Sequence, residues 1–286
     1  MSSSVNRITI LGLGLIGGSW ALALRRAAAV TELVAWGRDQ HRLDQAVAAG
    51  IVDSATTDMK AAVAAADVVV IATPLSTMAT LFEQLAPLLA AHTVVTDVGS
   101  AKARVIELAR ERLGDKFSRF VPGHPVAGSE HSGFEAATAG LFERRRVVLT
   151  PAVETDAAAC ALIEELWRAT GAEVVRMDAV RHDQVLALTS HLPHVVAYLL
   201  VDMLARQGGD EATRFAAGGF YDITRIASSS PQMWCDIFLE NRACVDVLLG
   251  QYIDSLQHFR QAIVDGDTDY LMQVMQRAKA TRDKLG

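Results

Sequence analysis

A glycine-rich hexad near the N-terminus limits what this chain can fold into more than any other feature. Residues 12–17 read GLGLIG and match the pattern G-x-G-x-x-G; they follow the β-branched run at residues 7–11 and precede an alanine-rich helical stretch. A strand, a glycine turn and a helix in this order are typical of a dinucleotide-binding fold, in which the helix N-terminus faces a pyrophosphate. Gly12 permits the tight turn, Gly14 the approach of the backbone to the phosphates, and Gly17 close packing of helix on strand. The residues expected to contact such a cofactor are Gly12, Gly14, Leu15, Ile16 and Gly17.

Short β-branched runs alternate with helical stretches through the first 178 residues. Continuous apolar strands that alternate with helices are typical of a parallel sheet covered on both faces. We therefore predict an α/β fold, with a doubly wound parallel sheet of Rossmann type over residues 1–178. The expected strands are residues 7–11, 33–36, 68–72, 93–97, 119–122, 146–150 and 173–176, and the expected helices are residues 18–26, 39–49, 77–89, 101–112 and 156–170.

No β-rich run follows the sheet domain, and apolar residues recur at helical spacing from there on. We expect helices over residues 182–206, with a kink or break at Pro193, over a long segment opened by Pro231, and over residues 267–284. Residues 179–286 are predicted to form an all-helical domain that closes over the substrate. Apolar stripes on so many helices exceed what one small domain can bury, so we expect a homodimer through this domain. The alternative is that the stripes form only the domain's own core and its contact with the sheet domain.

Composition narrows the class of partner and the compartment. The 286 residues include 27 basic and 33 acidic side chains, a net charge of −6, and no lysine- or arginine-rich block, so we expect no nucleic-acid partner. Three widely spaced cysteines form no C-x-x-C pair, which indicates free thiols in a reducing cytoplasm. The uncharged run at residues 8–24 contains four glycines, so we expect neither a signal peptide nor a spanning helix, and no membrane partner.

The end of the second expected strand bears on the type of dinucleotide. NAD-binding folds place an acid there, about 20 residues after the glycine motif, to bond the ribose 2′-hydroxyl. Gly37 stands at that position and Arg38 follows; glycine leaves room for a 2′-phosphate and arginine pairs with it bidentately, so NADP is favoured over NAD. The alternatives are that Arg38 is a solvated surface charge and that Asp39, slightly later, reaches the hydroxyl. We expect Thr73 and Pro74, which end a buried strand at the ligand-binding edge, to contact the cofactor.

Two polar loops follow predicted strands at the same edge of the sheet, at residues 97–102 (DVGSAK) and 123–130 (GHPVAGSE). Polar residues in glycine- and proline-rich loops at this edge are more often functional than structural. His124 is the candidate general base because the ordinary pKa of imidazole lies near 6.5, and Ser100 is the candidate to bond the same substrate oxygen. The structural alternatives are a hydrogen-bonded core histidine and a serine that N-caps the helix from Ala101.

The helical region offers a second polar set. Ser190, His191 and His194 belong to the sequence SHLPH, and the two histidines fall roughly on one helix face. No carboxylate stands at the spacing of a metalloprotease-type zinc site, so we expect no metal. A glycine pair at residues 218–219 interrupts the helical pattern ahead of Arg225, which is a candidate for binding a carboxylate or, alternatively, for an interdomain ion pair.

Together these segments resemble the prephenate/arogenate (cyclohexadienyl) dehydrogenase family of tyrosine biosynthesis over nearly the whole chain. Many dehydrogenases share the glycine motif, whereas the histidine loop, SHLPH and the late tryptophan segment, in this order, are much more specific. The matching segments are residues 12–18 (GLGLIGG), 72–74 (ATP), 97–102 (DVGSAK), 123–133 (GHPVAGSEHSG), 190–194 (SHLPH), 224–227 (TRIA) and 233–241 (MWCDIFLEN).

The resemblance implies a Rossmann-type domain, a helical dimerisation domain, and oxidative decarboxylation of arogenate or prephenate with hydride transfer to NADP or NAD. By position, His124 would take the proton of the ring hydroxyl, Ser100 would support this contact, and Arg225 would bind a substrate carboxylate. Glu130 would lie at the pocket edge, where it would attract the ammonium of arogenate or face His131 or solvent. The positions that match substrate-site residues of the family are Ser190, His191, His194, Arg225 and Glu130.

Two rivals belong to other classes. A β-hydroxyacid-type dehydrogenase shares the two-domain layout but needs a catalytic lysine in the helical domain, and residues 178–269 contain no lysine. A non-catalytic nucleotide-sensing module would not need the polar set of Ser100, His124, His194 and Arg225 together. The chain also lacks the aspartate that NAD-specific relatives carry after the second strand, which agrees with a preference for NADP.

Overall fold

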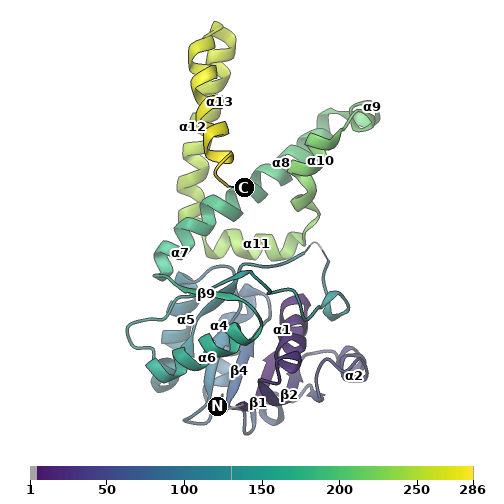
Figure 1. Ribbon diagram of the computed structural model, residues 1–286, viewed down its shortest axis with the longest axis vertical. Helices are drawn as coiled ribbons and strands as arrows, with labels where there is room; N and C mark the ends of the chain where they lie inside the picture. The colour runs from purple at the N-terminus through teal and green to yellow at the C-terminus, as the bar shows by residue number, and fades with distance from the viewer. Residues whose placement is uncertain (1–4, 130, 286) are drawn as a thin grey trace. The chain divides into compact units, whose positions relative to one another are not determined.

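The computed structural model describes residues 5–129 and 131–285 and divides into two compact units, Met1–Asn241 and Arg242–Gly286 (Figure 1). Every strand of the described residues lies in the first unit, where helices follow the last strand, and the second unit is a pair of helices. The predicted fold class, a doubly wound parallel sheet followed by an all-helical region, is confirmed.

The first unit is built on a six-stranded parallel sheet. Its strands are β1 (Val5–Leu11), β2 (Val30–Trp36), β3 (Ser54–Thr56), β4 (Val68–Ile71), β5 (Val94–Asp97) and β6 (Phe120–Val121), in the order β3-β2-β1-β4-β5-β6. β1 and β4 lie side by side at the centre, where Leu11 pairs with Ile71. The strand order reverses between these two strands, and ligands of such sheets bind outside the carboxyl ends at this switch point. The glycine motif follows β1 and Thr73 follows β4, so both stand there.

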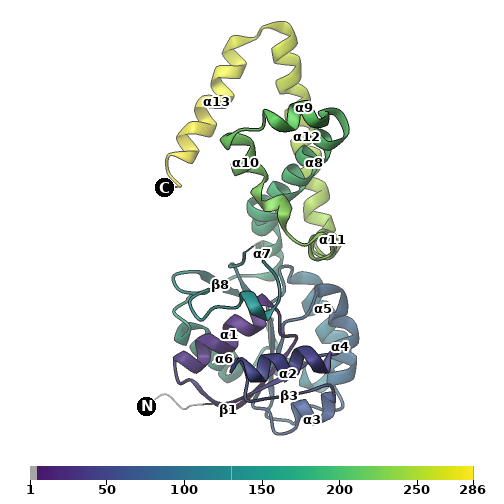
Figure 2. The ribbon, with the colours of Figure 1, turned by 90° about the vertical axis from the view of Figure 1, so that its right-hand side faces the viewer.

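Helices cover both faces of this sheet (Figure 2). They are α1 (Leu15–Arg26), α2 (Gln40–Ala48), α3 (Met59–Val63), α4 (Met78–Leu85), α5 (Ala103–Leu113) and α6 (Ala157–Ala169), with short 3₁₀ turns η1 (Leu75–Thr77), η2 (Gly114–Arg119) and η3 (Phe134–Ala136). Neighbouring residues of a strand point to opposite faces, so Val70 joins the core under α1 and α6, whereas Ile71 joins the core under α4 and α5. Trp20 and Trp167 fill the first core, with ring centroids 5.2 Å apart.

Three strands form a second, smaller sheet. They are β7 (Gly123–Pro125), β8 (Arg146–Leu149) and β9 (Glu173–Arg176), in the order β7-β8-β9, with β7 antiparallel to β8. The expectation that residues 146–150 and 173–176 extend the parallel sheet is therefore wrong. His124 lies within β7, opposite Val148, so a paired strand holds it where the sequence indicated a loop.

A helical run of 29 residues follows β9 and consists of α7 (Ala179–Leu186), a π-helical turn η4 (Ala187–His191) and α8 (Leu192–Gln207). The sequence predicts a kink or a break at Pro193; the helical run does not break there, although the missing N–H of this residue interrupts the hydrogen-bond pattern within the run. The irregularity falls instead in the π-helical turn before it. The remaining elements of the unit are α9 (Gly209–Arg214), α10 (Gly218–Thr224), the 3₁₀ turn η5 (Arg225–Ser228) and α11 (Pro231–Glu240).

The run Ala179–Gln207 is the one helix of the described residues with the length and mean hydropathy of a membrane span. Length and composition alone are weak evidence, because core helices have the same properties. His182, Asp183 and His191 in this run are buried and hydrogen-bonded to other polar side chains. That pattern is typical of a helix packed within a protein.

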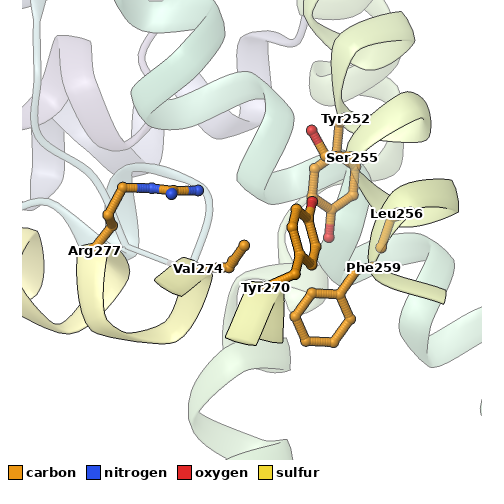
Figure 3. A pocket seen from close by; sticks show the side chains of 7 residues that line it. All are labelled: Tyr252, Ser255, Leu256, Phe259, Tyr270, Val274 and Arg277. Carbon is orange, nitrogen blue, oxygen red and sulfur yellow. The ribbon is translucent and has the colours of Figure 1, made fainter. Parts of the chain in front are cut away.

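The second unit consists of α12 (Arg242–Asp265) and α13 (Thr268–Arg282). Asp267 begins α13, because its side chain accepts a hydrogen bond from the amide of Tyr270 (3.0 Å). A hollow of about 250 Å³ lies between the two helices (Figure 3), lined by Tyr252, Ser255, Leu256, Phe259, Tyr270, Val274 and Arg277. Several apolar side chains of α12 stay exposed, namely Val247, Ile253, Leu256, Ile263 and Val264. Among the described residues, these side chains of α12 therefore present apolar surface to solvent.

Candidate active site

The glycine motif has the geometry that a phosphate-binding turn requires. Gly12 has φ +95°, and a Cβ there would lie 2.8 Å from the Thr73 methyl group, so a side chain does not fit. A Cβ at Gly17 would lie 2.4 Å from the Gly12 carbonyl oxygen, which shows how closely α1 approaches the turn. A Cβ at Gly14 would meet nothing within 4 Å, so the backbone is open here.

Helix α1 begins at Leu15, directly after this open glycine. No side chain caps its N-terminus and no acid stands in its first turn, so its first amides can meet an anion. Ile16 packs against the core below and fixes the turn on the sheet. The open glycine and the uncapped helix start leave room for a dinucleotide pyrophosphate at this turn.

The loop after β4 is held by side-chain hydrogen bonds. The Thr77 hydroxyl donates to the Pro74 carbonyl oxygen (2.7 Å), so the Thr73 hydroxyl is the donor in its 2.7 Å contact with Thr77. Ser76 donates its hydroxyl to Asp236 of α11 (2.6 Å). The loop expected to contact the cofactor is therefore tied to the helical segment of the same unit.

Gly37 follows β2 at the position where NAD-binding folds have an acidic residue. Arg38 is exposed next to Gly37. Asp39 accepts a hydrogen bond from the Arg42 amide (3.2 Å) and N-caps α2, so this carboxylate serves the helix start. The Arg42 guanidinium pairs with Glu135 (3.1 Å).

A buried ion pair joins the two polar loops. Lys102 Nζ donates to the Asp97 carboxylate and to the Gly123 carbonyl oxygen (2.9 Å), and neither charged side chain has exposed surface. Asp97 also accepts from the amides of Gly99 (2.8 Å) and Gly123 (3.2 Å). Burial lowers the pKa of Lys102, and the charge of Asp97 opposes this shift. The pair fixes the first residue of β7 and hence the backbone next to His124.

His124 belongs to a buried chain of hydrogen bonds that the sequence did not predict. His124 Nδ1 lies 2.8 Å from His182 Nε2, and His182 Nδ1 lies 2.8 Å from Asp183 Oδ1. The three residues are 7%, 0% and 3% exposed. Burial lowers the pKa of His124 well below 6.5, and the charges of His182, Lys102 and His191 lower it further. At neutral pH the imidazole is therefore neutral and able to accept a proton.

Asp183 also begins helix α5. Its Oδ1 accepts from the Lys102 amide and its Oδ2 from the Ala103 amide, both at 2.9 Å. Burial raises the pKa of Asp183, but the hydrogen bonds from His182 and these amides outweigh it, so the net shift is downward. The interpretation of Ser100 as the N-cap of α5 is wrong, because the helix starts at Ala103 and the cap comes from Asp183. Ser100 is half-buried in the loop before it.

His191 is bound on the far side of this network. Its Nδ1 accepts from the Asn241 side-chain amide (3.1 Å), which also donates to the Asp183 carbonyl oxygen (2.9 Å). Burial lowers the pKa of His191 to about 4, so its imidazole is neutral at neutral pH. A buried asparagine thus links the π-helical turn to the start of α7.

His194 lies flat on an indole ring. Its centroid is 3.5 Å from that of Trp234, with an interplanar angle of 22°. His194 Nδ1 lies 2.9 Å from the Ser190 carbonyl oxygen and donates to it, so Nε2 is the accepting nitrogen. Burial lowers the pKa of His194, and the charge of Arg225, the first residue of η5, lowers it further. Arg225 is therefore close enough to His194 for its charge to act on this imidazole, and Ser190 is hydrogen-bonded to the same ring.

Glu130, the remaining predicted residue, lies outside the described residues. Within residues 5–129 and 131–285 no group of three metal-binding side chains is present. Sequence reasoning missed several site residues, namely Lys102, His182, Asp183, Trp234 and Asn241. The available signal was the polar pair at 182–183, which shares the buried side of α7 with Leu186.

Comparison with known proteins identifies the family. Residues 20–176 match the family described as prephenate dehydrogenase, nucleotide-binding domain, and residues 178–277 match prephenate dehydrogenase, dimerization domain. The chain belongs to the prephenate dehydrogenase family. It is 37% identical to a cyclohexadienyl dehydrogenase of Zymomonas mobilis, over 96% of this chain and 94% of that protein.

Solved structures of the family agree along the whole chain. A prephenate dehydrogenase from A. aeolicus in complex with hydroxyphenyl propionate and NAD⁺ has a TM-score of 0.93 and 34% identity, with 100% of both chains covered. An arogenate dehydrogenase from Synechocystis has a TM-score of 0.82 and 29% identity, over 98% of this chain and 100% of that chain. The chain is therefore an NAD(P)-dependent dehydrogenase, and the β-hydroxyacid-type and non-catalytic alternatives are set aside.

Proposed function

We propose that this chain oxidatively decarboxylates a cyclohexadienyl substrate, prephenate or arogenate, with hydride transfer to NADP or NAD, in tyrosine biosynthesis. The observation that carries the proposal is the buried imidazole of His124, hydrogen-bonded to His182 at the carboxyl edge of the sheet, together with the open turn at Gly14. The names of the relatives, which include cyclohexadienyl, prephenate and arogenate dehydrogenases, support the substrate class.

The proposed chemistry assigns one proton to His124. The bound dinucleotide, held by the glycine turn, supplies the hydride acceptor. His124 Nε2 accepts the ring hydroxyl proton while the carbon that bears this hydroxyl loses hydride. The ring carboxylate then leaves as CO2, the electrons of the broken C–C bond make the ring aromatic, and His124 returns the proton to the phenolate oxygen. Ser100 supports the contact with that oxygen.

The remaining predicted residues orient the substrate. Arg225 binds a substrate carboxylate, because guanidinium pairs with carboxylate in a two-point geometry. His194, stacked on Trp234, lines the same site, with Ser190 and His191 in the turn before it. Prephenate and arogenate differ by a keto group and an ammonium, and both stay proposed substrates: Glu130 would favour arogenate if it attracts the ammonium, and would favour neither if it faces His131 or solvent.

The direct test of this function is an assay of the purified chain with prephenate or arogenate and with NAD or NADP, followed by the absorbance of the reduced nicotinamide and by release of CO2. At least one of the four combinations is expected to turn over, with one CO2 per reduced nicotinamide. Absence of turnover in all four would refute the proposal.

We propose NADP as the preferred dinucleotide, supported by the exposed Arg38 beside Gly37 and by the engagement of Asp39 in the cap of α2. Replacing Arg38 with alanine is expected to raise KM for NADP roughly tenfold and KM for NAD by less than about twofold, because only NADP carries the 2′-phosphate. Lys60→Ala, which removes another exposed cation, serves as the matched control. An equal effect of Arg38→Ala on both dinucleotides would argue against the assignment.

We also propose that residues 1–178 bind the dinucleotide and residues 179–286 close over the substrate and pair two chains. The proposed enzyme is cytoplasmic, with a small-molecule substrate and no nucleic-acid or membrane partner. The family description of residues 178–277 as a dimerization domain and the exposed apolar side chains of α12 support the homodimer.

A charge on α12 is expected to weaken that dimer. The chain of 30.7 kDa should sediment at twice this mass, and Ile263→Glu should shift it toward the monomer, because Ile263 is 60% exposed within the chain. Gln257→Glu, which adds the same charge at another exposed position of α12, controls for charge alone. A monomer at all concentrations would contradict the proposal.

A further inference from the structure

We propose that His182 and Asp183 are positioning residues that relay the substrate proton away from His124. The inference rests on the proposed role of His124 as the base. When a new N–H bond forms at His124 Nε2, the proton on His124 Nδ1 moves to His182 Nε2. The positive charge then rests on His182, beside the Asp183 carboxylate, and the reverse shift returns the proton at the end of the cycle.

The hydrogen-bond partners of Asp183 dictate where the protons start. Both carboxylate oxygens accept from backbone amides, those of Lys102 and Ala103, so Asp183 is an acceptor throughout. His182 Nδ1, at 2.8 Å from Oδ1, must therefore donate to it. A neutral His182 then has its lone pair on Nε2, which faces His124 Nδ1 at 2.8 Å. His124 must donate there, and its own lone pair is left on Nε2.

Electrostatics favour moving the charge along this chain. A cationic His124 would stand in a buried region near Lys102, and its nearest hydrogen-bonding neighbour is another histidine. A buried charge without an opposite partner is costly, whereas a cationic His182 has the Asp183 carboxylate 2.8 Å away. The relay therefore lets the base accept a proton without holding the charge.

Separate elements of the same unit fix His124 and Asp183, and His182 is hydrogen-bonded to both of them. The pairing of β7 with β8 holds His124, the start of α5 holds the Asp183 carboxylate, and Asn241 holds the Asp183 carbonyl oxygen. Because each bond is already formed, the proton shift requires no movement of heavy atoms. Such preorganisation is what a proton relay requires.

The kinetic test compares His182→Gln and Asp183→Asn with His92→Gln, which removes an exposed histidine. Each relay variant should lower kcat about 10²-fold, with KM for the dinucleotide changed less than about twofold. In His182→Gln the acid limb of kcat should also move to higher pH. The titratable groups that face His124 are His182, Lys102, His191 and, through His182, Asp183. Because His182 lowers the pKa of His124, its removal should raise that pKa.

A spectroscopic test determines the tautomers of the wild-type relay directly, and substitutions serve only to assign the signals. Nitrogen NMR of histidine-labelled enzyme, assigned with His124→Asn, should show His124 protonated at Nδ1 and bare at Nε2. The opposite tautomer, or a His182→Gln variant with kcat within about threefold of wild type and an unmoved acid limb, would overturn the relay. Normal turnover by His124→Asn would instead refute the role of His124 as the base. A refuted relay can therefore be told apart from a refuted base.

Discussion

Replacing His124 with asparagine is expected to lower kcat by about 10²–10⁴-fold, because the variant has no base for the hydroxyl proton. Dinucleotide affinity should stay nearly unchanged, since the glycine turn that we propose holds the phosphates follows β1 and precedes α1, whereas His124 lies in β7. Steady-state kinetics with the active pair of substrate and dinucleotide measure the first effect, and titration of intrinsic fluorescence measures the second.

His92→Asn is the control for this substitution, because it makes the same chemical change at an exposed position outside the site. The wild-type kcat should also stay flat from neutral pH to below pH 6.5: the neutral imidazole is the active form, and its lowered pKa moves the acid limb to lower pH. Normal turnover by His124→Asn, or an acid limb above 6.5, would contradict the role of His124 as base.

Replacing Lys102 with methionine is expected to destabilise the fold by about 3–5 kcal/mol, because it leaves the buried Asp97 carboxylate without its counter-charge. Asp97 has no exposed surface, and its two backbone donors, Gly99 and Gly123, do not neutralise it. Chemical denaturation gives the free energy of unfolding.

The double variant Asp97→Asn/Lys102→Met should recover part of this loss, since it removes both buried charges at once. Lys60→Met, at an exposed position, should change the free energy of unfolding by less than about 0.5 kcal/mol. A Lys102→Met variant as stable as Lys60→Met would mean that the pair does not hold the two loops together.

The parallel sheet could be predicted because its signal is local. Each central strand is a run of β-branched residues long enough to stand out, and the glycine turn marks where the first one ends. β3 has only three residues at the sheet edge, and β7 contains glycine, histidine and proline, so neither shows a strand pattern. β7 exists because β8, a later part of the chain, pairs with it. The residues of β7 alone do not indicate that β8 will pair with them.

The same limit explains which site residues the sequence revealed. His124 and Ser100 belong to conspicuous polar segments of the sequence, and Arg225 follows a glycine pair. His182 and Asp183 lie in α7, whose apolar spacing is that of an ordinary helix. Their role follows from long-range hydrogen bonds: His182 bonds a residue 58 positions away, and Asp183 bonds one 80 positions away. The alternative that Ser100 caps α5 fails for the same reason, because the residue that caps this helix, Asp183, is distant in the sequence.

The π-helical turn η4 decides which side of its helical run His191 faces. An α-helix rotates about 100° per residue, so His182 and His191 would face opposite sides of a regular helix. The wider turn holds an extra residue, and Asn241 bonds both His191 and the backbone of Asp183. Each residue of a π-helical turn contributes less than the roughly 100° of an α-helix, so η4 accommodates the extra residue without turning His191 away from Asn241.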